Sequence, residues 1–373
     1  MTKLHLAVDL SGAGAHPAAW RAVDARSRAG FTDVRRQVAL ADDAGFDLAL
    51  LDDSFTLAPS SARTVRGSLD AVLVGSWLAP TSDAIGLVAT VDTTHTEPFH
   101  VAKALQTLDH VSAGRAGWQV AWSTSPAAAA AFGRKGVQDE RDAVDEAREV
   151  VDVVRDLWDS WEDDAEIRDV ATSRFVDRAK LHYVDHVGER FSVKGPSITP
   201  RSPQGQIPVV VRVDSPESVA LAGQVADVVR IEARGTNRAA ELRHQVRAAA
   251  LAAGRDPALV RVLVDVVVLL GADAGAAQAR REVLDGLAGT PFDPATVLHV
   301  GDAAGLVELA TRWAPLVDGL TLRPASLLTD LPLLADTLPL LRREGLAGRP
   351  ASGATLRDSL GLARPASRYA VAG

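Results

Sequence analysis

Short apolar runs recur along this chain, and stretches with helical spacing separate most of them. Several runs are apolar at nearly every position, as in 209–213 (Val-Val-Val-Arg-Val) and 264–268 (Val-Asp-Val-Val-Val). A strand buried on both faces of a parallel sheet has this continuous pattern. We therefore predict eight buried strands, at 4–9, 47–52, 85–91, 116–122, 207–213, 227–231, 261–270 and 318–322.

Most of the predicted strands are separated by helical segments, which lie at 32–44, 66–80, 139–160, 216–225, 238–253 and 273–287. Eight strands that alternate with helices in one chain predict the α/β class and a (β/α)8 TIM barrel. A doubly wound open sheet is the alternative. The chain lacks the G-x-G-x-x-G and Walker A motifs that nucleotide-binding open sheets carry, which favours the barrel. We expect a single barrel domain over 1–373.

Two segments fall outside the alternation. The first, 162–206, begins with three acidic residues and is then rich in His, Gly and Pro. It predicts an insertion between the fourth and fifth strands, and insertions of this length in compact barrels are usually lids or interface elements. The second is a C-terminal tail, 347–373, rich in Gly, Ala, Pro and Arg, which we expect to wrap around the outside of the barrel.

Polar residues gather where the third and fourth predicted strands end. The apolar run 85–91 is followed by Asp-Thr-Thr-His-Thr-Glu at 92–97, and the run 116–122 is followed by Ser-Thr-Ser at 123–125. Ligands bind at the carboxyl ends of parallel strands in α/β proteins. The position of these groups therefore predicts an enzyme or a small-molecule binder.

Composition narrows the class of function. Hydrophobic residues make up 47% of the chain, which is enough for a large core, and the 48 acidic against 40 basic residues argue against nucleic acid as a partner. The absence of cysteine excludes disulfides, thiolate nucleophiles and Cys-ligated metals. No apolar run has membrane-spanning length, and the chain enters its first strand without a signal region. We expect a cytoplasmic protein with no membrane partner.

Ordered motifs identify a known family. They are HPAAWR (16–21), FDLALLDDS (46–54), EPFHVAK (97–103), LDHVS (108–112), GRAGW (114–118), LWDSWEDDA (157–165), DHVGERFSVKGP (185–196) and TLRDSLGLARP (355–365). Together they resemble the flavin-dependent monooxygenases of the bacterial luciferase superfamily, in the branch of nitrilotriacetate and dibenzothiophene-sulfone monooxygenases. The resemblance implies a (β/α)8 barrel, acting as a homodimer, that uses reduced FMN from a separate flavin reductase, and O2, to oxygenate a small organic substrate.

The resemblance also implies where the flavin binds. Transferred to this sequence, the cofactor-binding positions are Asp53, Thr90, Gln119, Gln138, Asp142, Asp214 and Ser215. Asp53, Thr90, Gln119 and Ser215 follow or end four different strands, so a barrel should bring them together at its carboxyl end.

Several of these positions depart from the family pattern. Gln119 stands where the family has Asn, and Gln138 and Asp142 stand where it has His and Tyr. The family's glycine-rich turn after the fifth strand becomes Val213 and Asp214 followed by Ser-Pro-Glu-Ser. Each carboxylate close to a phosphate would repel it by about 4 kcal/mol at an effective dielectric constant of about 20. Nearby cations that could offset this repulsion are Arg134, Lys135, Arg141 and Arg212.

Histidines are the candidates for proton transfer. His16, His95 and His100 all fall in or beside segments expected at the carboxyl end of the barrel, and imidazole exchanges protons near neutral pH. His182 and His186 are spaced like metal ligands. Because they lie within the family's structural motif, we expect no metal site there.

Three functions remain open from the sequence. The first is an FMN-dependent monooxygenase that works with a reductase. The second is a divergent non-catalytic barrel subunit or binding protein with a weakened flavin site. The third is a deazaflavin-dependent oxidoreductase of the same superfamily. Absorbance spectra with and without FMN distinguish them, whereas nothing in the sequence names the substrate.

Overall fold

Eight parallel strands close into a barrel in the computed structural model, which describes residues 3–21, 31–56 and 68–369. Around the barrel they run β1 (His5–Asp9), β2 (Leu48–Leu51), β3 (Gly86–Asp92), β4 (Ala116–Ala121), β9 (Val209–Val213), β10 (Val228–Ile231), β11 (Arg261–Leu270) and β13 (Gly319–Pro324). Pairing of β13 with β1 and of β10 with β11 completes the closure. These are the eight strands that the sequence predicted, so the (β/α)8 barrel is confirmed and the open sheet is excluded.

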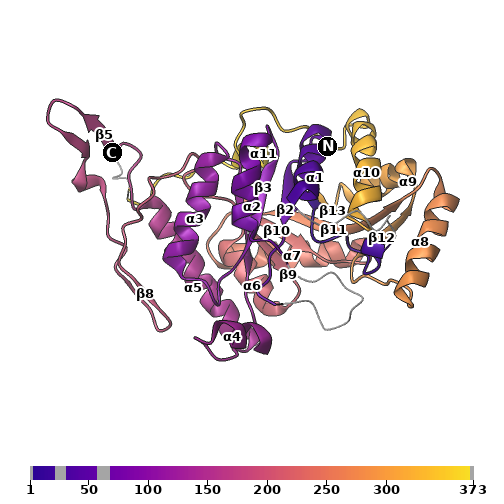
Figure 1. Ribbon diagram of the computed structural model, residues 1–373, viewed down its shortest axis with the longest axis horizontal. Helices are drawn as coiled ribbons and strands as arrows, with labels where there is room; N and C mark the ends of the chain where they lie inside the picture. The colour runs from indigo at the N-terminus through magenta and orange to yellow at the C-terminus, as the bar shows by residue number, and fades with distance from the viewer. Residues whose placement is uncertain (1–2, 22–30, 57–67, 370–373) are drawn as a thin grey trace.

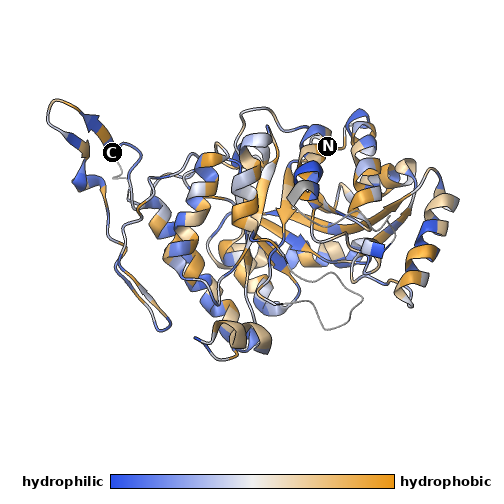
Figure 2. Cartoon of the chain, viewed as in Figure 1, coloured by the Kyte–Doolittle hydropathy of each residue, from blue (hydrophilic) through white to orange (hydrophobic). Residues whose placement is uncertain are grey.

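Helices surround the strands (Figure 1), and the strands are largely hydrophobic in Figure 2. The principal helices are α1 (Phe31–Ala44), α2 (Ala71–Leu78), α3 (Pro98–Val111), α4 (Pro126–Phe132), α5 (Glu140–Asp159), α6 (Pro216–Val225), α7 (Thr236–Ala252), α8 (Ala274–Ala288), α9 (Ala303–Trp313) and α10 (Leu327–Arg343). The helix predicted at 66–80 is shorter than expected, and its first two predicted positions lie outside the described residues. Among the described residues, no helix is long and apolar enough to cross a membrane.

The large sheet also contains a ninth strand that was not predicted. β12 (Val297–Gly301) pairs in parallel with the second half of β11, from Val266 to Leu270, and lies outside the closed barrel. On one edge, the ten-residue β11 pairs with β10 along its first half and with β12 along its second half, so it is long enough for both. β12 is only partly buried, so its sequence lacks the continuous apolar pattern of the other strands.

The C-terminal tail closes the amino end of the barrel, which corrects the expectation that it lies outside. Leu356, Leu360 and Leu362 pack with the apolar inward residues Ala7, Leu48, Leu50, Val88, Val210, Val228 and Leu263. The short helix α11 (Leu356–Ser359) begins where the Leu356 N–H donates to the carbonyl of Gly114, 2.9 Å away, just before β4. Apolar side chains therefore fill the amino-terminal half of the barrel interior, and its polar side chains lie toward the carboxyl end.

The segment 162–206 leaves the barrel between β4 and β9 and projects from it in Figure 1. It contains two small antiparallel pairs, β5 (Glu166–Asp169) with β6 (Arg174–Val176) and β7 (His186–Val187) with β8 (Ser192–Val193). His182 contacts Glu162 at 2.8 Å and His186 contacts Glu149 at 2.9 Å. In the described part of the chain no group of three or more His, Cys, Asp or Glu side chains is placed so that it could hold a metal.

Candidate functional site

A cavity of about 610 Å³ opens at the carboxyl ends of β2, β3 and β4, and we call it the β3–β4 cavity. It lies where the polar residues after the third and fourth strands were expected to gather. Its lining combines apolar walls with hydroxyls and carboxylates, and comprises Asp53, Ser54, Phe55, Thr56, Asp70, Val72, Leu73, Thr90, Val91, Asp92, Thr96, His100, Val101, Ala104, Ala121, Trp122, Ser123, Thr124, Ser125 and Ala128.

Asp53 organises one wall of this cavity. Its carboxylate accepts the N–H of Ser54 at 2.7 Å, the hydroxyl of Ser68 at 3.0 Å and the N–H of Ala71 at 3.3 Å. These bonds join the end of β2 to the start of α2. The neighbouring Asp70 caps α2 by accepting the N–H of Leu73 at 2.8 Å.

A buried chain of polar groups lies beneath the cavity. Gln119 Nε2 donates to Thr90 Oγ1 at 2.9 Å, and Arg230 Nη1 donates to Gln119 Oε1 at 2.8 Å. Arg230 also binds Asp265 through Nε at 3.1 Å and Nη2 at 2.7 Å, and Asp9 through Nη2 at 3.0 Å. All of these side chains point into the barrel from β1, β3, β4, β10 and β11.

The charges of this cluster stabilise one another. Burial alone would lower the pKa of Arg230, but Asp265 and Asp9 outweigh it and hold that pKa above its usual value. Burial likewise raises the pKa of Asp9, and the charges of Arg230 and Arg323 outweigh it and lower the pKa overall. Arg230 and Asp9 therefore both stay ionised at neutral pH.

Sequence reasoning missed Asp9, Arg230, Asp265 and Arg323. A signal was present, because each is a charged residue within or at the end of an apolar strand, as in Val264-Asp265-Val266. In a strand buried on both faces such a residue needs a buried partner. The partners come from strands far apart in the sequence, so the signal could not name them.

Nearer the mouth, Arg323 and Arg212 share a carboxylate. Arg323 Nη1 donates to Glu232 Oε1 at 3.1 Å, and Arg212 Nη2 lies 3.6 Å from Glu232 Oε2. Arg212, expected as a cation for the flavin phosphate, is thus already paired with an acid.

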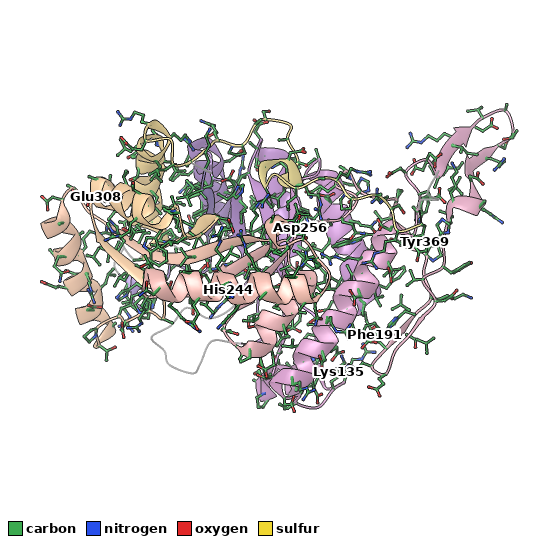
Figure 3. The ribbon with its side chains drawn as sticks, turned by 180° about the vertical axis from the view of Figure 1, so that it is seen from behind. Lys135, Phe191, His244, Asp256, Glu308 and Tyr369 are labelled. Atoms are coloured by element: carbon green, nitrogen blue, oxygen red, sulfur yellow. The ribbon has the colours of Figure 1, made fainter. Side chains whose placement is uncertain are left out.

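The other expected phosphate residues also have internal partners. Gln138 Nε2 donates to Glu146 at 2.7 Å, Lys135 forms a hydrogen-bonded ion pair with the same Glu146, and Arg134 lies 3.4 Å from Glu97. Figure 3 shows Lys135 and Phe191 beside the amino-terminal end of α5. Asp142, in the first turn of α5, is exposed and lies 3.8 Å from Arg190. Arg141 is exposed on the same helix.

The polar groups of the turn between β9 and α6 form hydrogen bonds with one another. The N–H groups of Asp214 and Ser215 donate to Ser218 Oγ at 3.0 and 2.9 Å, and the N–H of Ser218 donates to Ser215 Oγ at 3.1 Å. Pro216 contributes no N–H, and Ser218 is fully buried. Donors that could cradle an anion at a helix start therefore face a serine hydroxyl inside the protein.

Ser215 and Asp214 line a second cavity, also of about 610 Å³, which we call the β9–β10 cavity. Ser215 reaches the first cavity only indirectly. Its Oγ lies 3.4 Å from Glu140 Oε1, which accepts the indole N–H of Trp122 at 3.0 Å. Of the four residues expected to converge, Asp53 and Thr90 line one cavity, Gln119 bonds to Thr90, and Ser215 lies in the cavity beside it.

The three candidate histidines lie in three environments. His16 is buried, accepts the N–H of Ala18 at Nδ1 and contacts Asp285 at 3.1 Å through Nε2, away from both cavities. His95 stacks on Phe132 with ring centroids 4.9 Å apart. His100, on α3, is exposed and lines the β3–β4 cavity.

Comparison with known proteins agrees with the fold and the motifs. A family model for luciferase-like monooxygenases matches residues 11–316. N-acetyl-S-(2-succino)cysteine monooxygenase of Bacillus subtilis (strain 168) is 29% identical, covering 99% of this chain and 98% of that protein. Nitrilotriacetate monooxygenase component A of Aminobacter aminovorans is 31% identical, covering 79% of this chain and 68% of that protein.

A solved long-chain alkane monooxygenase superposes with a TM-score of 0.87 at 21% identity, covering 97% of this chain and 96% of that one. At that identity the likeness establishes the fold alone. The match of the family model over most of the chain, together with the sequence relatives, establishes more: this chain belongs to the family of luciferase-like, flavin-dependent monooxygenases.

Proposed function

We propose that this chain is the oxygenase component of a two-component system. It takes up reduced FMN delivered by a separate flavin reductase and uses O2 to oxygenate a small organic substrate, with the flavin ring in the β3–β4 cavity. The observation that carries the proposal is the cavity itself, with a volume of about 610 Å³ at the carboxyl ends of three barrel strands. Ligand cavities in proteins are typically about 300–1,000 Å³.

The residues present fit the ring of a flavin. An isoalloxazine ring needs broad apolar walls and a few polar groups at its edge. Val72, Val91, Val101 and Trp122 supply apolar surface, and Thr90 supplies a hydroxyl at the floor.

The described residues offer few positive charges to bind the flavin phosphate. The described lining of the β3–β4 cavity carries Asp53, Asp70 and Asp92 but neither lysine nor arginine. The internal pairing of Lys135, Arg134 and Arg212 supports weak binding of FMN, through its ring more than through its phosphate. Weak binding suits a flavin that arrives reduced from another protein and leaves again.

When bound, a reduced flavin supplies the electrons that activate O2. The chain's own residues hold and shield the reactants. Thr90 can donate a hydrogen bond to the edge of the ring, and Phe55 and Trp122 place aromatic surface along the cavity and displace water. His100 stands at the rim, where its ring nitrogens can exchange a proton between solvent and the cavity.

A steric block of the cavity tests the proposal. Ala128 is buried in α4 and lines the cavity, whereas Ala130 lies on the same helix with its side chain exposed. We expect Ala128→Leu to weaken FMN binding at least about tenfold, because the added methyl groups occupy space needed by the ring, and Ala130→Leu to leave binding unchanged. Anaerobic titration of reduced FMN, with melting curves of both variants, provides the measurement.

The titration also separates the alternatives. Saturable FMN binding that Ala128→Leu weakens by this factor or more supports the monooxygenase. Binding of a deazaflavin in preference to FMN would move the chain to the deazaflavin-dependent class. If neither cofactor binds the wild-type protein, the non-catalytic barrel subunit is the better description.

A further inference from the structure

The hydrogen bonds beneath the β3–β4 cavity run in a fixed direction. The guanidinium of Arg230 has donors only, so the group of Gln119 that faces it at 2.8 Å must be the amide oxygen. The amide nitrogen of Gln119 then faces Thr90 and donates to its hydroxyl oxygen at 2.9 Å. The orientation of a glutamine amide, often ambiguous in a structure, is determined here by chemistry.

Arg230 is itself held in place. Two of its nitrogens bind the two carboxylate oxygens of Asp265, at 3.1 and 2.7 Å, and a third bond of 3.0 Å reaches Asp9. Arg230 and Gln119 expose only 5% and 9% of their surface. A reversed amide would set NH2 in direct contact with a guanidinium, at 2.8 Å, and buried polar groups do not tolerate two donors facing each other.

The consequence falls on Thr90. Its oxygen already accepts a hydrogen from Gln119, so its own hydrogen remains to be donated. Among the described residues Gln119 is its sole hydrogen-bond partner. Thr90 lines the β3–β4 cavity, so the hydrogen of its hydroxyl is available to whatever fills that space.

We propose that Arg230 and Gln119 are positioning residues that make Thr90 an obligate hydrogen-bond donor to the cavity ligand. The ligand must then present an acceptor at that point, and a flavin does so with the carbonyl and ring-nitrogen edge of its isoalloxazine. The inference rests on the proposed function, since it takes the ligand to be a flavin. Gln119, expected from the family to bind the cofactor, acts in this inference through Thr90 and does not contact the cofactor itself.

Variants of Thr90 give the first test. Thr90→Val keeps the shape of the side chain but removes the donor, and we expect FMN affinity to fall about tenfold, which is the usual effect of one lost hydrogen bond. Thr90→Ser keeps the donor and should retain wild-type affinity. Thr93→Val is the matched control, because Thr93 lies just beyond β3 and its hydroxyl donates to the carbonyl of Ala121 at 3.0 Å, outside the cavity lining.

A variant that reverses the direction of the hydrogen bond between Gln119 and Thr90 gives the second test. In Gln119→Glu the carboxylate accepts from both Arg230 and Thr90, so the hydroxyl of Thr90 turns inward and the cavity loses its donor. We expect the visible absorbance spectrum of bound FMN to change in Gln119→Glu as it does in Thr90→Val. In the double variant, Thr90→Val should cause no further loss of affinity, because the donor is already gone.

The outcomes are distinct. If Thr90→Val binds FMN as tightly as wild type, or if the two changes add in the double variant, the inference is overturned while the proposed function stands. If wild-type protein binds no FMN at all, the proposed function fails and the inference fails with it. Melting curves ensure that only folded variants are compared.

Discussion

Asp47, at the amino end of β2, is a buried carboxyl whose ionisation opposes folding. Its Oδ2 accepts the N–H of Leu6 at 2.7 Å, yet burial raises its pKa to about 7 against the opposing effects of that bond and of Arg342. The folded state therefore holds this proton more tightly than the unfolded state. Its contribution to stability is complete below the unfolded pKa, near 3.8, and is lost as pH rises through about 7.

Asp47→Asn should remove this dependence, because asparagine keeps the acceptor and cannot ionise. We expect the unfolding free energy of the variant, minus that of wild type, to rise by about 2 kcal/mol between pH 5 and 7.5. His5, whose pKa burial lowers to about 4, acts in the opposite sense but is common to both proteins and cancels. Urea unfolding at several pH values measures the difference. A difference independent of pH would show that Asp47 titrates alike in both states.

At the level of residues, the sequence singled out Thr90 and Gln119 as candidates but gave no sign of the contact between them. Both were assigned to the flavin from a family pattern, whereas their contact depends on the register that pairs Thr90 with Gln119 between β3 and β4. The role of Arg230 depends on the order of strands in the barrel, in which only β9 lies between β10 and β4. The local sequence around these residues predicts neither the contact of Thr90 with Gln119 nor that of Arg230 with Gln119.

At the level of elements, α11 closes the barrel at its amino end. Leu356 is 1% exposed, and a Cβ atom added at Gly86 would lie 2.6 Å from its side chain and one added at Gly117 would lie 3.0 Å from it, so the fit is close. Leu356→Ala should destabilise the protein by about 2–4 kcal/mol, because it removes buried methyl groups and leaves a cavity. Leu251→Ala, at a leucine that is 66% exposed on α7, is the matched control and should change stability by less than about 0.5 kcal/mol. Equal unfolding free energies for the two variants would contradict a plug role for the tail.

The eight barrel strands were predictable because both of their faces are buried, which gives a continuous apolar pattern. β12 and the strands of the insertion were not, since they are short or partly exposed and lack that pattern. α2 begins later than its apolar pattern suggested, because Asp70 caps it and fixes its start at Ala71. The position of the C-terminal tail could not be predicted from the sequence. The tail fills the open amino end of the barrel, and that opening exists only once the strands have assembled.

At the level of the whole molecule, the barrel places two cavities of similar size side by side around one charged cluster. Thr90 belongs to the β3–β4 cavity and Glu232 to the β9–β10 cavity. Between them run Gln119, Arg230 and Asp9, and Arg323 continues the cluster to Glu232. The proposed ring position, in the first cavity, is thus separate from the phosphate positions expected from the family. Of these, Asp214 and Ser215 line the second cavity, whereas Arg134 and Lys135 line a third, smaller one.

This division predicts how the protein distinguishes flavins. A phosphate normally adds affinity through charge-assisted bonds that together can exceed a hundredfold. Here the amides of the β9–α6 turn bond to Ser218, and Lys135, Arg134 and Arg212 are paired with acids. We therefore expect reduced riboflavin and reduced FMN to bind with dissociation constants within about fivefold of each other, since the ring is common to both. Anaerobic titration of the two ligands at low and at high salt makes the comparison. A much tighter FMN complex that weakens with salt would mean that cations outside this set hold the phosphate, and the weakened phosphate site would be disproved.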